Sequence, residues 1–152
     1  MSNAVYYALK KKFPPPAFAS LREVRNQTGY SNGMIRSVDL LVMGLFPSRG
    51  IELTGIEVKT HRGDWIKELS NPAKADEGWF LHCDHWFLAT EPGVADISEV
   101  PSTWGWMEMK GQRLFTRKPA PKLTPLAIDR PHLAALFRSI GDSSDKFAEI
   151  EI

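Results

Sequence analysis

The hydrophobic positions at the start of the chain first follow a helical period and then an extended one. A short helix is predicted for residues 2–12, whose apolar positions recur at helical spacing: Val5, Ala8 and Leu9. Consecutive prolines from Pro14 onward end this helix. Residues 18–26 suit a strand, and a segment rich in turn-forming residues follows it.

Two long apolar runs come next and predict the centre of a sheet. Residues 36–46 and residues 51–60 read as strands, and the segment 47–50 between them reads as a tight turn. The simplest arrangement of two strands joined so closely is an antiparallel hairpin.

After Thr60 the apolar residues return to a helical period. One side of this helix carries Trp65, Ile66 and Leu69, and we expect Trp65 to belong to the core. A second helical segment is predicted for residues 73–82, and residues 85–90 read as a buried strand. A strand reached through a helical crossover pairs in parallel with the strand that precedes the crossover.

The last third of the chain predicts smaller elements. The pattern predicts that residues 104–109 and 113–117 are the two strands of a small hairpin. A final helix is predicted to begin near Asp129 and to stop at Gly141. One face of that helix carries four apolar residues: Leu133, Leu136, Phe137 and Ile140. The predicted fold class is α/β, with a mixed central β-sheet flanked by helices and a C-terminal hairpin and helix. One domain is expected over residues 1–141, with a tail at 142–152.

Charged residues stand in the two central strands, where they are costly. Asp39 lies inside one apolar run, and Glu57 and Lys59 lie in the next. Successive strand residues point to opposite faces, so Glu57 and Lys59 share a face. Ionised carboxylates in such surroundings cost several kcal/mol unless they are paired or bound to a metal. Carboxylates with water and a backbone carbonyl suit Mg²⁺ or Mn²⁺, and an adjacent lysine can orient a metal-bound water.

Composition and charge narrow the class of protein. The chain has one cysteine, Cys83, so it forms no internal disulfide, and a reducing, cytoplasmic location is expected. Its apolar runs are shorter than the ~18 residues that span a bilayer, so no membrane association is expected. Residues 1–38 carry six Lys or Arg and one acid, a charge of +5, and residues 39–152 carry thirteen basic and seventeen acidic residues, a charge of −4. The basic end either approaches phosphates or is a solvated helix.

The pattern of Asp39 followed by Glu57-Val58-Lys59 resembles the PD-(D/E)XK nuclease superfamily, whose fold is restriction-endonuclease-like. Together with the stretches around Arg36 and His82, it looks like the MmcB-like putative DNA-repair nucleases. The resemblance implies a Mg²⁺-dependent endonuclease acting on DNA, in DNA repair or phage DNA processing. It also implies a third acid ahead of Asp39, for which Glu23 is the candidate, and a metal ligand from the Val58 carbonyl.

Several residues near the motif are candidate DNA contacts: Arg25, Arg36, His61 and Arg62. The other interpretation of the motif is structural, with Asp39 capping a turn or pairing with Arg36 and with Glu57 and Lys59 as an exposed pair. A catalytically inactive DNA-binding or assembly protein with the same fold, and an accessory protein without a nucleic-acid role, remain alternatives. The sequence leaves open whether the chain forms a homodimer.

A run of potential ligands, His82-Cys83-Asp84-His85, also suggests a transition metal. Four contiguous residues in a passage from helix to strand cannot all face one ion. Zinc held by this run alone is therefore disfavoured.

Overall fold

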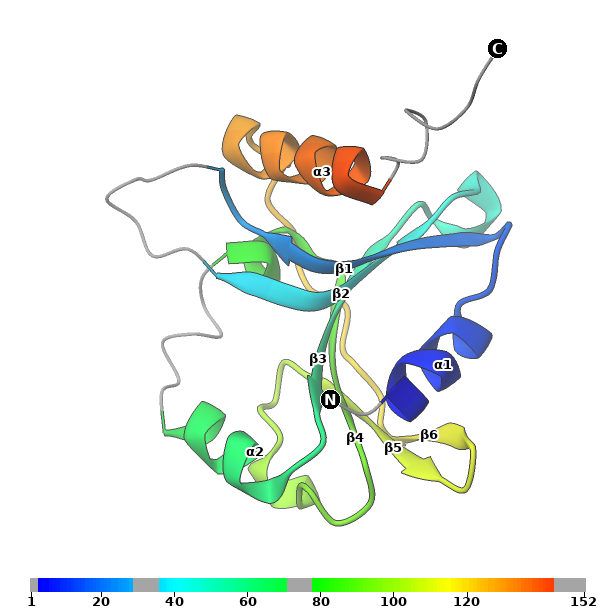
Figure 1. Ribbon diagram of the computed structural model, residues 1–152, viewed down its shortest axis with the longest axis vertical. Coiled ribbons are helices and arrows are strands. Elements are labelled where there is room, and N and C mark those ends of the chain that lie inside the picture. The colour runs from blue at the N-terminus through cyan, green and yellow to red at the C-terminus, as the bar shows by residue number, and fades with distance from the viewer. Residues whose placement is uncertain (1–2, 29–35, 71–77, 144–152) are drawn as a thin grey trace.

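The computed structural model describes residues 3–28, 36–70 and 78–143, and a six-stranded mixed sheet forms its centre (Figure 1). The strands cross the sheet in chain order: β1 (Phe18–Arg25), β2 (Ser37–Gly44), β3 (Leu53–Lys59), β4 (His85–Thr90), β5 (Gly105–Lys110) and β6 (Arg113–Lys118). β1, β2 and β3 are antiparallel, β3, β4 and β5 are parallel, and β6 returns antiparallel to β5. The α/β class, the central hairpin and the parallel β3–β4 pair are thus confirmed.

Helices cover both faces of the strongly twisted sheet. α1 (Asn3–Lys12) packs Val5 and Leu9 against one face, in a core that residues of β2 to β6 share, whereas α2 (Arg62–Leu69) lies on the opposite side (Figure 1). α3 (Arg130–Ser143) lies beside β1 and adds Leu136 to the same core as α2. The expected position of Trp65 in the core is confirmed, since it is fully buried. Among the described residues no helix is long and apolar enough to cross a membrane.

A glycine in β3 fixes how β3 and β4 fit together. Gly55 pairs with Trp86, whose ring lies so close that a Cβ atom at Gly55 would come within 2.2 Å of it. The indole therefore occupies space that any other residue at position 55 would fill. This contact supports the parallel register in which Glu57 lies opposite Leu88 and Lys59 opposite Thr90.

The second predicted helical segment differs from the structure. Of residues 73–82, only the 3₁₀ helix η3 (Gly78–His82) is described, and residues 71–77 lie outside the described residues. η3 nevertheless buries the side chains of Trp79 and His82.

The last helix is longer than predicted and is turned differently. α3 continues through Gly141 to Ser143, so the expected stop at Gly141 is wrong. Residues 144–152 lie outside the described part of the chain. Its buried face carries His132 and Ala135, whereas Phe137 is 68% exposed. The apolar pattern alone therefore failed to give the orientation of this helix, because polar contacts at its start hold His132 inward.

Candidate active site at the end of the β2–β3 pairing

Asp39 and Glu57 lie opposite each other where β2 and β3 stop pairing. Leu40 and Ile56 are the last paired residues, and the next position along each strand is Asp39 on β2 and Glu57 on β3. In place of a further backbone bond, the Oδ2 atom of Asp39 accepts a hydrogen bond from the Val58 N–H at 2.8 Å. The two strands therefore separate at a point where one carboxylate already bridges the gap between them.

The Glu57 carboxyl is held in an environment that disfavours its charge. Its pKa is raised well above the ordinary value, first by burial and then by the negative charges of the neighbouring Asp39 and Glu68. The Lys59 ammonium acts in the opposite direction but does not cancel these effects. The Asp39 and Glu57 carboxyl groups therefore lie close enough to repel each other when both are charged.

Lys59 stands on the same face of β3 as Glu57, as expected for two positions separated by one residue. Its Nζ atom is 3.7 Å from Oε2 of Glu68 on α2, and the side chains of both residues are largely buried, at 19% and 14% exposure. Glu68 was not identified from the sequence. The signal was available in principle, because a lysine confined to this face needs a partner and α2 follows β3 directly.

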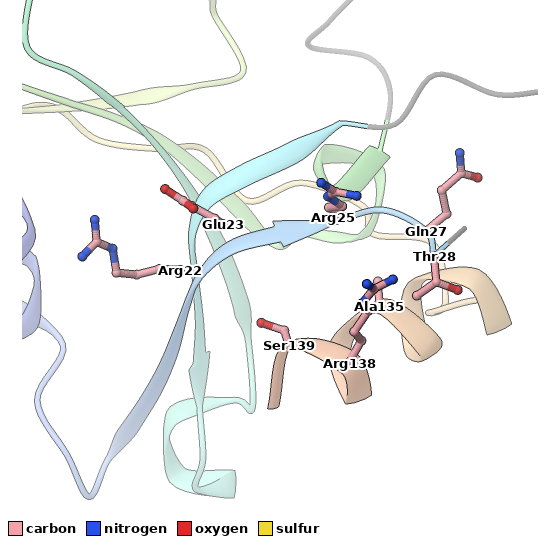
Figure 2. A pocket seen from close by; sticks show the side chains of 8 residues that line it. All are labelled: Arg22, Glu23, Arg25, Gln27, Thr28, Ala135, Arg138 and Ser139. Carbon is pink, nitrogen blue, oxygen red and sulfur yellow. The ribbon is translucent and has the colours of Figure 1, made fainter. Parts of the chain in front are cut away.

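Glu23 completes a row of acids across three strands. Arg22 pairs with Leu40 and Val24 with Val38, which places Glu23 opposite Asp39. The backbone of Glu23 has φ 53°, a left-handed value that is unfavourable for a side chain with a Cβ atom. Such outliers concentrate at functional sites. Glu23 is exposed, and Figure 2 shows its side chain directed away from α3, toward the β2 side of β1.

Tyr6 of α1 is a further residue of the site that sequence reasoning missed. Its ring lies under the Arg22 guanidinium, 3.8 Å from centroid to Cζ. The pKa of its phenol is raised, first by burial and then by the charge of Asp39, with a smaller contribution from Glu23. Tyr6 therefore remains a neutral hydrogen-bond donor beside the acids. The helical pattern had marked Val5, Ala8 and Leu9 and gave no reason to separate Tyr6 from the core.

The predicted metal ligands have the chemistry that a hard cation needs. Asp39 and Glu57 offer carboxylate oxygens, and the Val58 carbonyl points to the same side of β3 as its N–H, toward Asp39. Two neighbouring acids whose charges repel are suited to bind a divalent ion, and Mg²⁺ and Mn²⁺ prefer oxygen ligands to softer donors. This donor set fits Mg²⁺ or Mn²⁺.

Beside the acids, a basic pocket of about 400 Å³ lies between β1 and α3 (Figure 2). Glu23 lines its edge, and Arg25 from β1 and Arg138 from α3 lie on its two sides. Both arginines are exposed. The pocket is thus a positively charged recess that begins at the row of acids.

The four predicted DNA contacts have different surroundings. Arg25 is exposed in the basic pocket, and His61 is exposed at the start of α2, two residues beyond Lys59. Arg36 is half-buried just ahead of β2, and its backbone pairs with Asn26. For Arg25, Arg36 and His61, which lie near the acids, contact with DNA stays a prediction.

Arg62 is held by the fold instead. Its guanidinium donates two hydrogen bonds to the Glu99 carboxylate, at 2.6 and 2.7 Å, and a third to the Val94 carbonyl. Glu99 also accepts a hydrogen bond from the Trp65 indole. Because a bidentate pair of this kind fixes the guanidinium plane, Arg62 fastens α2 to the segment after β4. It is therefore left out of the DNA contacts proposed below.

The run from His82 to His85 is divided among different partners. Asp84 accepts a hydrogen bond from the Leu53 N–H and pairs with Lys122 at 2.6 Å, so it supports the start of β3. Cys83 is buried, and burial raises the pKa of its thiol. His82 turns toward α3. The side chains of these neighbouring residues therefore face different surroundings.

Comparison with known proteins shows the fold and leaves the activity open. No family model and no curated protein matches the chain. A solved structure, the SPO1766 protein of unknown function from Silicibacter pomeroyi, is similar with a TM-score of 0.60 and 17% sequence identity over 95% of this chain and 89% of that chain.

Proposed function

We propose that the chain is a metal-dependent deoxyribonuclease of the PD-(D/E)XK type, which hydrolyses phosphodiester bonds of DNA. One observation carries the proposal. The Asp39 and Glu57 carboxyl groups lie opposite each other at the point where β2 and β3 separate, with Lys59 on the same face. Two acids in these positions repel each other when both are charged, and a cation between them would relieve that repulsion.

Asp39, Glu57 and the Val58 carbonyl would hold Mg²⁺ or Mn²⁺. When bound, such an ion polarises a phosphoryl oxygen and makes a water molecule more acidic. The chain supplies the orientation: the Asp39 carboxylate accepts a hydrogen bond from the Val58 N–H, and Glu57 is half-buried on β3. Both ligands are therefore in place before substrate arrives, which reduces the ordering that binding requires.

Lys59 would orient the attacking water and neutralise charge that develops on the phosphate. Glu68 limits the motion of its ammonium group, because the 3.7 Å ion pair spans from β3 to α2. Tyr6, a neutral donor near Asp39, would hydrogen-bond a phosphate oxygen, and Glu23 would assist a second ion.

DNA would be held mainly through its phosphates. Arg25 and Arg138 line the recess that begins at Glu23, and His61 lies beyond Lys59 at the opposite end of the site. The excess of positive charge in residues 1–38 brings the polyanion to this side of the molecule.

The test is a gel assay of cleavage with duplex, single-stranded, flap and branched DNA, with Mg²⁺, with Mn²⁺ and with chelator. We expect metal-dependent cutting by the wild-type chain and none by Asp39→Asn or Lys59→Met, while Glu52→Gln, at an acid between β2 and β3 and outside the row, cuts normally. DNA binding with no cutting of any substrate would instead support an inactive DNA-binding protein of the same fold. Cutting by both site variants would exclude the proposed mechanism.

A further inference from the structure

A second cluster of metal-binding groups lies away from the row of acids, where η3 meets the start of α3. One ligand atom each of His82, Asp129 and His132 lies within 4.8 Å of the others. Both histidines are buried, whereas Asp129 is about half exposed. The cluster therefore has two imidazoles on the protein side and one carboxylate toward solvent.

The hydrogen bonds of His82 turn a lone pair toward Asp129. Its Nδ1 atom is 3.2 Å from the Leu126 carbonyl, which can only accept, so Nδ1 carries the proton. In the neutral ring the Nε2 atom then has a lone pair, and it lies 3.8 Å from Oδ2 of Asp129. A nitrogen lone pair and a carboxylate oxygen that face each other in this way can bind one metal ion together.

His132 has a similar imbalance. Its Nδ1 atom is 2.6 Å from Oδ1 of Asp129, and its Nε2 atom is buried with no hydrogen-bond partner among the described residues. The ring is 4.2 Å from the His82 ring, and it stands perpendicular to Trp79 at 4.7 Å, both measured between centroids. Two imidazoles this close to each other and to one carboxylate can bind a single cation together.

Part of the cluster has an ordinary structural role. Asp129 accepts a hydrogen bond from the His132 N–H at 3.0 Å, as an N-cap of α3 does, and its pKa is lowered mainly by this bond and by the His132 side chain. The cap explains Asp129 and the backbone of His132. It explains neither the inward position of His82 nor the buried Nε2 atom.

We propose that His82, Asp129 and His132 form a binding site for a divalent transition metal of the zinc class, which fastens α3 to η3. Two imidazoles and a carboxylate are a usual zinc ligand set, with Zn–N and Zn–O distances of about 2.0–2.2 Å. The exposed side of Asp129 leaves the fourth position to solvent.

This site differs in chemistry from the proposed nuclease centre. Imidazole ligands favour Zn²⁺, Co²⁺ or Ni²⁺ over Mg²⁺, whereas the row of acids favours hard ions. The consequence for the molecule is mechanical, because α3 forms one wall of the pocket that contains Arg25 and Arg138. Occupancy would hold that wall against β1.

The experiment uses the full chain after treatment with chelator. Zn²⁺ is added in a calorimetric titration, and Co²⁺ is added as an absorbing substitute. We expect one equivalent of Zn²⁺ to bind in a Glu57→Gln background, which removes the competing acid site, together with a higher Tm and the visible absorption of Co²⁺ in a nitrogen-containing site. Asp129→Asn, which keeps a capping oxygen, and His132→Gln should weaken binding by more than the roughly 10- to 100-fold that loss of an outer-shell partner costs.

His61→Gln is the matched control, since it removes an exposed histidine outside the cluster. It should bind Zn²⁺ as the parent does. Circular dichroism of the metal-free variants separates lost binding from lost folding, and Asp129→Asn alone decides the matter if His132→Gln does not fold. The proposal is overturned if the Glu57→Gln chain binds no Zn²⁺, or if binding persists in Asp129→Asn. Neither result bears on the nuclease proposal, which is tested by cleavage with Mg²⁺.

Discussion

Asp39 accepts a hydrogen bond from the backbone N–H of Val58 at 2.8 Å, across strands whose own pairing has just ended. After burial, the negative charge of this carboxyl group is the next cause of the raised Glu57 pKa. Asp39 therefore has two functions that different substitutions can separate: it satisfies a backbone donor of β3, and it supplies negative charge to the site.

Replacing Asp39 by Asn or by Ala should separate these functions. Asn keeps an oxygen that can accept from Val58, so we expect a fold of nearly unchanged stability and a loss of cleavage of at least about 100-fold. Ala loses cleavage equally and also leaves the N–H without its partner, at a cost of about 1 to 3 kcal/mol in the free energy of unfolding. Urea unfolding and the cleavage assay measure the two effects. Equal stability of the two variants would show that the hydrogen bond contributes little.

Glu57→Gln should stabilise the metal-free chain while it abolishes cleavage. The folded-state pKa of Glu57 is raised, first by burial, so the folded chain holds a proton that the unfolded chain releases above about pH 4.5. Wild-type stability should therefore fall as pH rises from that value to the folded-state pKa and then remain at the lower level. Gln carries no charge and removes this decline.

The measurement is Tm against pH for the two chains in chelator. We expect Glu57→Gln to melt higher than wild type at pH 8, by about 2 to 4 °C for each kcal/mol recovered, and the difference to vanish near pH 4. Mg²⁺ or Mn²⁺ should raise the Tm of the wild type and not that of the variant. Glu52→Gln serves as control, since it lies outside the row of acids. A Tm of Glu57→Gln below that of wild type at pH 8 would contradict the assignment.

Glu68→Gln should move the pH dependence of cleavage. The charge of Glu68 is one cause of the raised Glu57 pKa, so its removal lowers that pKa. Since the site needs ionised Glu57 to hold a metal ion, the acid limb of the rate profile should shift to lower pH. Rates at several pH values and fixed Mn²⁺ concentration test this. The same shift in Glu52→Gln, or none in Glu68→Gln, would show that Glu68 does not control the titration.

The elements that carry the acids were predictable because their signals are local. Asp39 and Glu57 stand inside continuous apolar runs, and the short turn between those runs fixes an antiparallel pair. Residues that join the site from other elements were not predictable in this way. Tyr6 reaches Asp39 from α1 and Glu68 reaches Lys59 from α2, and only the packing of both helices against the sheet brings them there.

The orientation of α3 shows a different limit. Its apolar residues predicted an inward face that includes Phe137, yet His132 lies inward and Phe137 is exposed. The contacts that decide this run from His132 and Asp129 to His82, which is more than forty residues away in sequence. Periodicity reports hydrophobicity along one element, so it cannot detect a polar cluster that forms only when two distant segments meet.

Arg25 and Arg62 provide the last test, because the sequence marked both as DNA contacts and the structure gives them different surroundings. Arg25 is exposed in the basic pocket, whereas Arg62 is bonded to Glu99, whose pKa it lowers to about 2. Arg25→Ala should therefore weaken DNA binding and reduce the slope of log K against log salt concentration by about 1. Arg62→Ala should leave that slope unchanged and lower the Tm.

The loss in Arg62→Ala should itself depend on pH. The low pKa of Glu99 stabilises the fold above the ordinary glutamate pKa, and this contribution disappears as pH falls toward 2. The Tm difference between Arg62→Ala and wild type should therefore be largest near neutral pH and shrink in acid. Fluorescence anisotropy with a short duplex over a range of salt concentrations gives the slopes, and metal is replaced by chelator so that cleavage does not interfere. If Arg62→Ala reduces the slope as Arg25→Ala does, the guanidinium leaves Glu99 when DNA binds, and its assignment to the fold alone is wrong.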